Sequence, residues 1–178
     1  MSTILIRWVE IAILILVALV SDIRHYKIRN RLTFPFMLIG LVTSLVLEGI
    51  PGLFESFIGI VAPFLLLFIL YALRMLGAGD VKLFSAIGAV LGYKAVLFIM
   101  AYSFLAGGVI AVMIVIINRN AKERFLHMFY YLRNVFLTFS IQPYTNFEEK
   151  DSKVVFRMAY AIACGVIIFF IEVMVRMK

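Results

Sequence analysis

Apolar residues follow one another in long runs along this chain, with few polar positions between them. A transmembrane helix needs about 20 mainly apolar residues. Four runs have this character: residues 4–20, 34–47 with their flanks, 57–76 and 154–175. A fifth run, residues 83–117, is too long for one crossing, and Gly92 divides it in two. The pattern therefore predicts six membrane-spanning helices, of which the fourth is short.

Composition supports a membrane protein and excludes an ordinary soluble domain. Hydrophobic residues make up 65% of the chain and charged residues only 15%. We expect an all-α, polytopic helical bundle that forms one membrane-embedded domain over residues 1–178, with residues 118–153 as its long polar loop. Within that loop, apolar residues recur at steps of three and four between Phe125 and Phe139. They predict an amphipathic helix in the headgroup region, where a purely structural clamp is the alternative to a role in chemistry.

The basic residues indicate an orientation in the bilayer. The net charge is +7, and thirteen of the 17 Lys and Arg residues fall on one side of the six predicted spans. By the positive-inside rule that side is cytoplasmic, which places both termini outside a plasma or inner membrane that the chain crosses several times. Because these cations stand beside apolar runs, we attribute them to topology and expect no nucleic-acid partner.

Aspartate is scarce in this chain, and two of its three positions are informative. Asp22 ends the first apolar run, Asp80 begins a later one, and Asp151 lies in the polar loop. Two predicted crossings separate Asp22 from Asp80, so both lie on the same face. Carboxylates at membrane depth are costly and usually functional, and this pair suggests an aspartic peptidase. Two structural alternatives are an ion pair of Asp22 with Arg24, and Asp80 as the cap of a helix that begins near Val81.

A longer motif surrounds each aspartate. Residues 77–83 read Gly-Ala-Gly-Asp-Val-Lys-Leu, and Asp22 is followed by Ile28-Arg29-Asn30. A glycine before Asp80 allows close backbone approach, and a helix N-terminus favours a carboxylate. Together these segments resemble the two motif blocks of type IV prepilin peptidases, the membrane aspartic peptidases of the GxGD kind. The family's usual Ile-Pro-Asn is Ile-Arg-Asn here, so no proline fixes the turn after Asp22.

The resemblance implies a function for these residues. Asp22 and Asp80 would form a catalytic pair that removes the basic leader of a prepilin or pseudopilin at the cytoplasmic membrane face. The supporting residues of the motif would be Gly77, Gly79, Lys82 and Asn30. No metal and no cofactor are expected. The chain begins with an apolar run and has one cysteine, so it resembles the short, peptidase-only members found in Flp/Tad-type pilus systems, and no N-methyltransferase activity is expected.

One acidic cluster and one other class of function complete the interpretation. Glu148, Glu149 and Asp151 form the only acidic cluster of the chain, and we expect them to dock the basic leader, with a solvated loop as the alternative. A small transporter or assembly subunit, in which Asp22 and Asp80 bind a cation or a proton, is the alternative function. Such a protein should carry polar groups at the midplane of its spans, whereas here they stand at the membrane edge.

Overall fold

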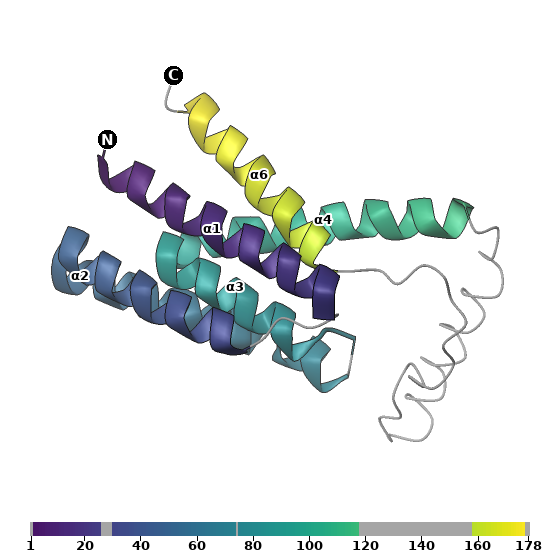
Figure 1. The fold of residues 1–178 in the computed structure, drawn as a ribbon, viewed down its shortest axis with the longest axis horizontal. Helices are drawn as coiled ribbons and strands as arrows, with labels where there is room; N and C mark the ends of the chain where they lie inside the picture. The colour runs from purple at the N-terminus through teal and green to yellow at the C-terminus, as the bar shows by residue number, and fades with distance from the viewer. Residues whose placement is uncertain (1, 26–29, 74, 118–157, 177–178) are drawn as a thin grey trace.

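The computed structural model describes residues 2–25, 30–73, 75–117 and 158–176, which form helices and no strands (Figure 1). The helices are α1 (Ser2–His25), α2 (Asn30–Ala72), α3 (Ala78–Leu91), α4 (Tyr93–Ile117) and α6 (Met158–Arg176). The all-helical architecture predicted from the sequence is confirmed for this part of the chain. The long loop, residues 118–153, and the amphipathic helix predicted within it lie outside the described residues.

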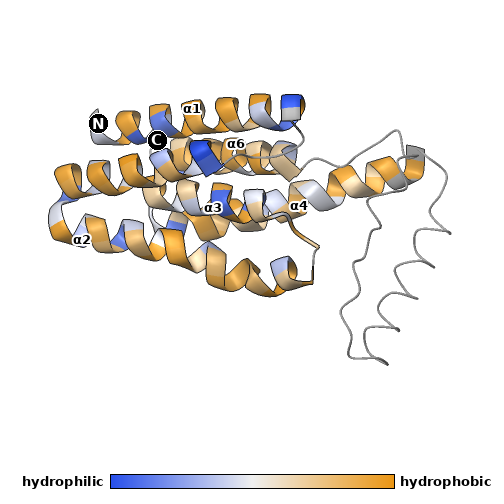
Figure 2. Ribbon diagram, turned by 60° about the horizontal axis from the view of Figure 1, so that its bottom comes forward, coloured by the Kyte–Doolittle hydropathy of each residue, from blue (hydrophilic) through white to orange (hydrophobic). Residues whose placement is uncertain are grey.

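Four helices, α1, α2, α4 and α6, are long and apolar enough to cross a membrane. Large apolar side chains are exposed along all four, and Figure 2 shows the apolar colour over most of the outer face of the bundle. Helix α3 has 14 residues, which corresponds to about 21 Å, less than the roughly 30 Å of a bilayer core. These are the helices of a multi-pass membrane protein with one short inner helix.

Helix α2 contains a sharp turn where the sequence predicts a loop. The pattern predicts separate spans at 34–47 with their flanks and at 57–76, and the stretch between them, which contains Glu48 and Glu55, is largely helical and not a loop. Only Gly49 leaves the helical conformation inside α2, with φ 70° and ψ −153°. A positive φ of this kind is readily adopted by glycine. One residue therefore reverses the chain, and both glutamates lie in helical segments.

The turn at Gly49 divides α2 into a first arm, residues 30–48, and a second arm, residues 50–72. Figure 2 shows the two arms folding back beside each other. The second arm ends at Ala72, four residues before the predicted end of the span. There the backbone N–H groups of Met75 and Leu76 donate to the carbonyl of Leu70 and close the helix.

Helix α3 packs closely against both arms of α2. A Cβ atom added at Gly59 would lie 2.2 Å from the carbonyl oxygen of Gly88, and one added at Gly40 would lie 2.7 Å from the carbonyl carbon of Ala89. Ser56 also donates a hydrogen bond to the Ala89 carbonyl. Small residues allow helix backbones to approach in this way. The C-terminal half of α3 is thus fixed against both arms.

The break between α3 and α4 falls at Gly92, as the sequence predicts. Gly92 has φ 84°, and its N–H donates to the carbonyl of Gly88 at 2.9 Å. Helix α4 then starts at Tyr93 and packs against α6. At that contact a Cβ atom on Gly165 would lie 2.2 Å from Ser103 Oγ.

The buried core draws on every described helix. Its members include Leu14 of α1, Phe84 and Ile87 of α3, Ile99 of α4 and Ile162 of α6. Helix α3 is the most deeply buried, since Val81 and all residues from Leu83 to Val90 are buried. The first turn of α3, however, reaches the end of the bundle where α1 also ends (Figure 1).

Candidate active site

Asp22 lies in the last turn of α1. The apolar run ends at residue 20, but the helix continues to His25, so Asp22 is held on a regular helix and not in a loop. Its side chain is half-buried. Residues 26–29, which include Ile28 and Arg29 of the Ile-Arg-Asn segment, lie outside the described residues. The chain resumes at Asn30, the first residue of α2.

Asp80 lies in the first turn of α3. One structural alternative made Asp80 the cap of a helix that begins near Val81; in the structure α3 begins at Ala78 and Gly77 is its N-cap. The backbone N–H of Asp80 donates to the Gly77 carbonyl at 3.1 Å. Asp80 is therefore the third helical residue, the position from which an acidic side chain reaches back to the N–H of the N-cap.

The electrostatic environment raises the pKa of Asp80 from its ordinary 3.8 to about 6. Burial contributes most, because it disfavours the charged form. The negative charge of Asp22 raises the pKa further, and a backbone hydrogen bond from Gly77 lowers it. Asp80 stands outside the four long helices. The site therefore holds two interacting carboxyl groups, one of which keeps its proton to an unusually high pH.

Gly77 leaves space for the carboxylate of Asp80. A Cβ atom at position 77 would lie 3.0 Å from Asp80 Oδ2, so any larger residue would displace that oxygen. The backbone of Gly77 is extended, with φ −74° and ψ 144°, a conformation that any residue can adopt. Glycine is therefore favoured here by the space it leaves and not by its backbone freedom. Gly79 is the second residue of α3 and is half-buried. Its supporting role stays a prediction.

Lys82 and Asn30, both named from the motif, are in contact. Lys82 Nζ donates to Asn30 Oδ1 at 2.8 Å across 52 residues of sequence. The same ammonium lies 5.7 Å from the ring centroid of Phe34, one helical turn after Asn30, within the range of a cation–π interaction. Sequence reasoning missed Phe34, because one aromatic in an apolar helix looks like a lipid-facing residue. Its spacing of four from Asn30 is the signal that was available.

The remaining predicted residues are not described. Glu148, Glu149 and Asp151, the expected docking cluster, lie outside the described residues. Within the described ranges, no group of three or more His, Cys, Asp or Glu side chains could hold a metal ion. The described site offers two interacting carboxyl groups, and the pKa of one of them, Asp80, is raised.

The fold and the site together define a class: a multi-pass helical membrane protein with a pair of interacting carboxyl groups at one end of its bundle. Comparison with known proteins gives the family. The model of the type IV leader peptidase family matches residues 9–112, more than half of the chain. The matched part contains both aspartates and the residues around them. The chain belongs to the type IV leader peptidase family.

Individual relatives agree with the family. The chain is 34% identical over 118 residues to a prepilin leader peptidase/N-methyltransferase of Bacillus subtilis, covering 65% of this chain and 47% of that protein. It is 28% identical over 131 residues to a protein of the same description from Aeromonas hydrophila, covering 70% and 43%. The chain spans about half the length of these relatives or less. No solved structure matches it.

Proposed function

We propose that this protein is an intramembrane aspartic endopeptidase that removes the basic leader from type IV prepilin-like substrates at the cytoplasmic face of the cell membrane. The observation that supports this most directly is the carboxyl group of Asp80, whose pKa is raised to about 6 by burial and by Asp22. Asp80 lies within residues 9–112, the part of the chain that matches the leader peptidase family. A carboxyl group with this pKa suits acid–base catalysis near neutral pH.

The proposed mechanism divides the work between the two carboxyl groups. Ionised Asp22 accepts a proton from water, and the water oxygen bonds to the scissile carbonyl carbon. Protonated Asp80 donates its proton to the carbonyl oxygen. The C–N bond then breaks as Asp22 passes the proton it took from water to the leaving amine and Asp80 recovers a proton from a hydroxyl group of the tetrahedral intermediate. Two adjacent carboxylates resist double ionisation, which keeps one proton in the pair. We expect kcat/KM to fall as the pH rises above about 6, where Asp80 loses its proton.

The proposed topology places both aspartates in the cytoplasm. Each arm of α2 has roughly 20 residues, about the length needed to cross the bilayer core. If both arms cross, the chain returns to its starting face between Asp22 and Asp80, and α3 is the short fourth of six helices. Reporter fusions at Arg29 and Asn146 should be cytoplasmic, and a fusion at Lys178 external. A cytoplasmic fusion at Lys178 would contradict this topology.

We further propose that the protein cleaves without methylating. The relatives are described as having both activities, but the family description that matches residues 9–112 names the leader peptidase alone. Mass spectrometry of a substrate processed by this protein should show a free N-terminal amine on the mature part. An N-methylated product, formed in the presence of a methyl donor, would disprove this part of the proposal.

The decisive test is replacement of each aspartate by its amide. Asn keeps the shape of Asp and accepts the same hydrogen bond, but it cannot exchange a proton. Asp22→Asn and Asp80→Asn should each abolish cleavage of a prepilin in proteoliposomes, and the double variant should be no worse than either single one. Glu48→Gln, the same kind of change at the other end of the first arm of α2, is the control and should remain active. Retained cleavage by Asp80→Asn would refute the aspartic mechanism, whereas a wild-type protein that cleaves no prepilin would favour a transporter or an assembly subunit.

A further inference from the structure

We propose that Lys82 is a positioning residue: its ammonium fastens the start of α3 to the first two turns of α2, and thereby holds Asp80 beside Asp22. This inference rests on the proposed function for its catalytic consequence, but the geometry it describes is independent of the reaction. It gives Lys82, Asn30 and Phe34 a shared task in the site.

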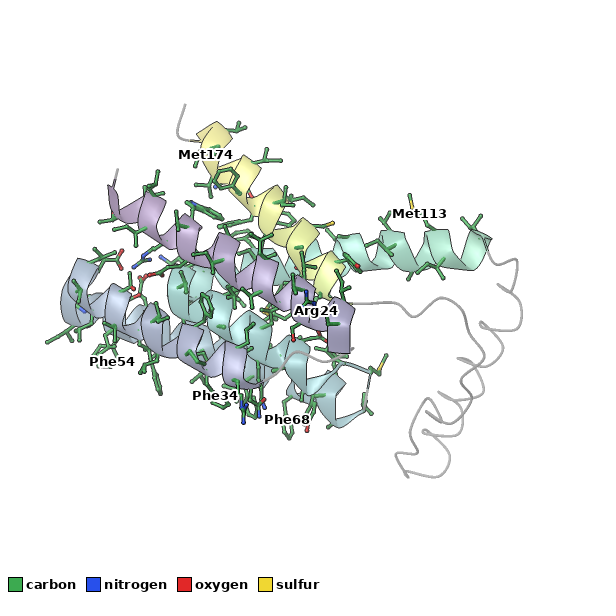
Figure 3. The ribbon with its side chains drawn as sticks, in the orientation of Figure 1. Arg24, Phe34, Phe54, Phe68, Met113 and Met174 are labelled. Atoms are coloured by element: carbon green, nitrogen blue, oxygen red, sulfur yellow. The ribbon has the colours of Figure 1, made fainter. Side chains whose placement is uncertain are left out.

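The contacts of Lys82 reach two successive turns of α2. Its Nζ donates to Asn30 Oδ1 at 2.8 Å and lies 5.7 Å from the centroid of the Phe34 ring. Asn30 is the first residue of α2, and Phe34 follows one turn later. Figure 3 labels Phe34 near the start of α2 and Arg24 near the end of α1, at the end of the bundle where α3 begins. Two contacts on one face of α2 restrain both the position and the direction of the Lys82 side chain.

The ammonium of Lys82 contacts residues of α2 and does not contact the carboxyl group of Asp80. Side chains two positions apart on a helix do not face each other. A cation beside Asp80 would also lower its pKa, whereas that pKa is raised by burial and by Asp22. The other charged side chains described at this end are Asp22 and Arg24 on α1 and Arg31 on α2. Lys82 therefore acts on Asp80 through the helix that carries both residues.

Packing holds the first turn of α3 less firmly than the rest of the helix, because Val81 is the one buried residue of that turn. From Leu83 to Val90 every residue of α3 is buried, and the Gly59 contact fixes that half of the helix. By contrast, Gly77 and Ala78 are exposed and Gly79 is half-buried. Lys82 stands between these two parts. Its link to α2 is thus placed where the tightly packed part of α3 gives way to the turn that carries Asp80.

The test measures the titration of Asp80 directly, without relying on cleavage. The carboxyl band of Asp80 is followed against pH by infrared difference spectroscopy, with Asp80→Asn as the blank, in the full chain in detergent. We expect Lys82→Met to lower the pKa of Asp80 from about 6 toward its ordinary value, because the two aspartates move apart and the effect of Asp22 is lost. Lys82→Arg can make the same contacts and should keep the wild-type titration.

Activity provides the second measurement. A small displacement of a catalytic group costs roughly 10- to 100-fold in rate, and we expect Lys82→Met to lower kcat for prepilin cleavage by about this factor. Lys94→Met removes the same charge just beyond the opposite end of α3, where Lys94 lies over Tyr93. This matched control should change neither the titration nor kcat.

The possible outcomes separate the two proposals. A rise in the pKa of Asp80 in Lys82→Met would show that the ammonium acts electrostatically, and an unchanged titration would show that it positions nothing; either result overturns the inference. If Lys82→Met does not fold, Asn30→Leu removes the acceptor without altering α3 and must shift the titration in the same direction. A wild-type protein that shows the titration but cleaves no prepilin would refute the proposed function and leave the positioning role standing.

Discussion

Carboxyl groups have opposite kinds of neighbours at the two ends of the first arm of α2. At the end near Gly49, Arg7 of α1 forms an ion pair with Glu48 at 2.9 Å, and Thr43 donates to Glu10 at 2.8 Å. At the end near Asn30, the carboxyl group of Asp80 interacts with the like charge of Asp22. At the Gly49 end, the charges that link the helices are thus paired with an opposite charge or a hydroxyl group. The pair that we assign to catalysis raises a pKa instead, which is a cost to stability at neutral pH.

The largest expected effect is a difference in activity between the two ends. Asp22→Asn should lower the rate of prepilin cleavage by about 10³-fold or more, because general acid–base catalysis contributes roughly 10² to 10⁴ for each group. Glu48→Gln changes a carboxylate to an amide in the same way at the other end and should leave the rate within about twofold. Equal losses in both variants would mean that the two ends are not functionally distinct.

The next effect concerns the space beside Asp80. Gly77→Ala places a methyl group 3.0 Å from Asp80 Oδ2 and should lower kcat roughly tenfold by moving the carboxyl group. Gly108 of α4 is the matched control, since a Cβ atom there meets nothing within 4 Å. Gly108→Ala should keep full activity in the same assay. A fully active Gly77→Ala would show that the carboxyl group tolerates displacement.

Stability should change in opposite directions at the two ends. Between about pH 4 and 6, folded Asp80 holds a proton that the unfolded chain releases, so the wild type gains stability as the pH falls through this window. At pH 7 the full penalty of about 3 kcal/mol is present, and Asp80→Asn removes it. That variant should melt at a higher temperature than the wild type at pH 7 and show little difference near pH 4.

Glu48→Gln should have the opposite sign. It breaks the ion pair with Arg7, which is partly exposed and contributes about 1 kcal/mol or less. Its melting temperature at pH 7 should be slightly lower than that of the wild type. Thermal denaturation of both variants in one detergent measures the comparison, and an unstabilised Asp80→Asn protein would argue against the strained carboxyl pair.

The smallest expected effect lies in the polar loop. Changing Glu148, Glu149 and Asp151 together to Lys should raise KM for a basic-leader substrate several-fold at low salt and less at high salt, because exposed charge pairs contribute about 0.2 to 1 kcal/mol each and are screened. Steady-state kinetics at two ionic strengths measure this. Unchanged KM at low salt would identify the cluster as a solvated loop.

The sequence predicts which residues form this site better than it predicts the contacts that these residues make. Scarce aspartates at the ends of apolar runs identify Asp22 and Asp80, because a carboxylate is costly there unless it has a use. The break at Gly92 was predicted because residues 83–117 would form one helix longer than the bilayer core is thick. The turn at Gly49 was missed, since a single glycine reverses the chain where the gap between the two apolar runs suggests a longer loop. The start of α3 was misplaced because two glycines before Asp80 disfavour a helix.

The contact between Gly59 and Gly88 has a consequence for how this chain tolerates change. A methyl group on either residue would lie within 2.2 Å of the other's carbonyl oxygen, so adding one carbon atom forces two helices apart. Lipid, by contrast, accepts almost any apolar side chain on the outer faces of α1 and α4. In a library of all single substitutions selected for leader cleavage, positions 59 and 88 should therefore be nearly as restricted as position 80, although neither residue takes part in the reaction.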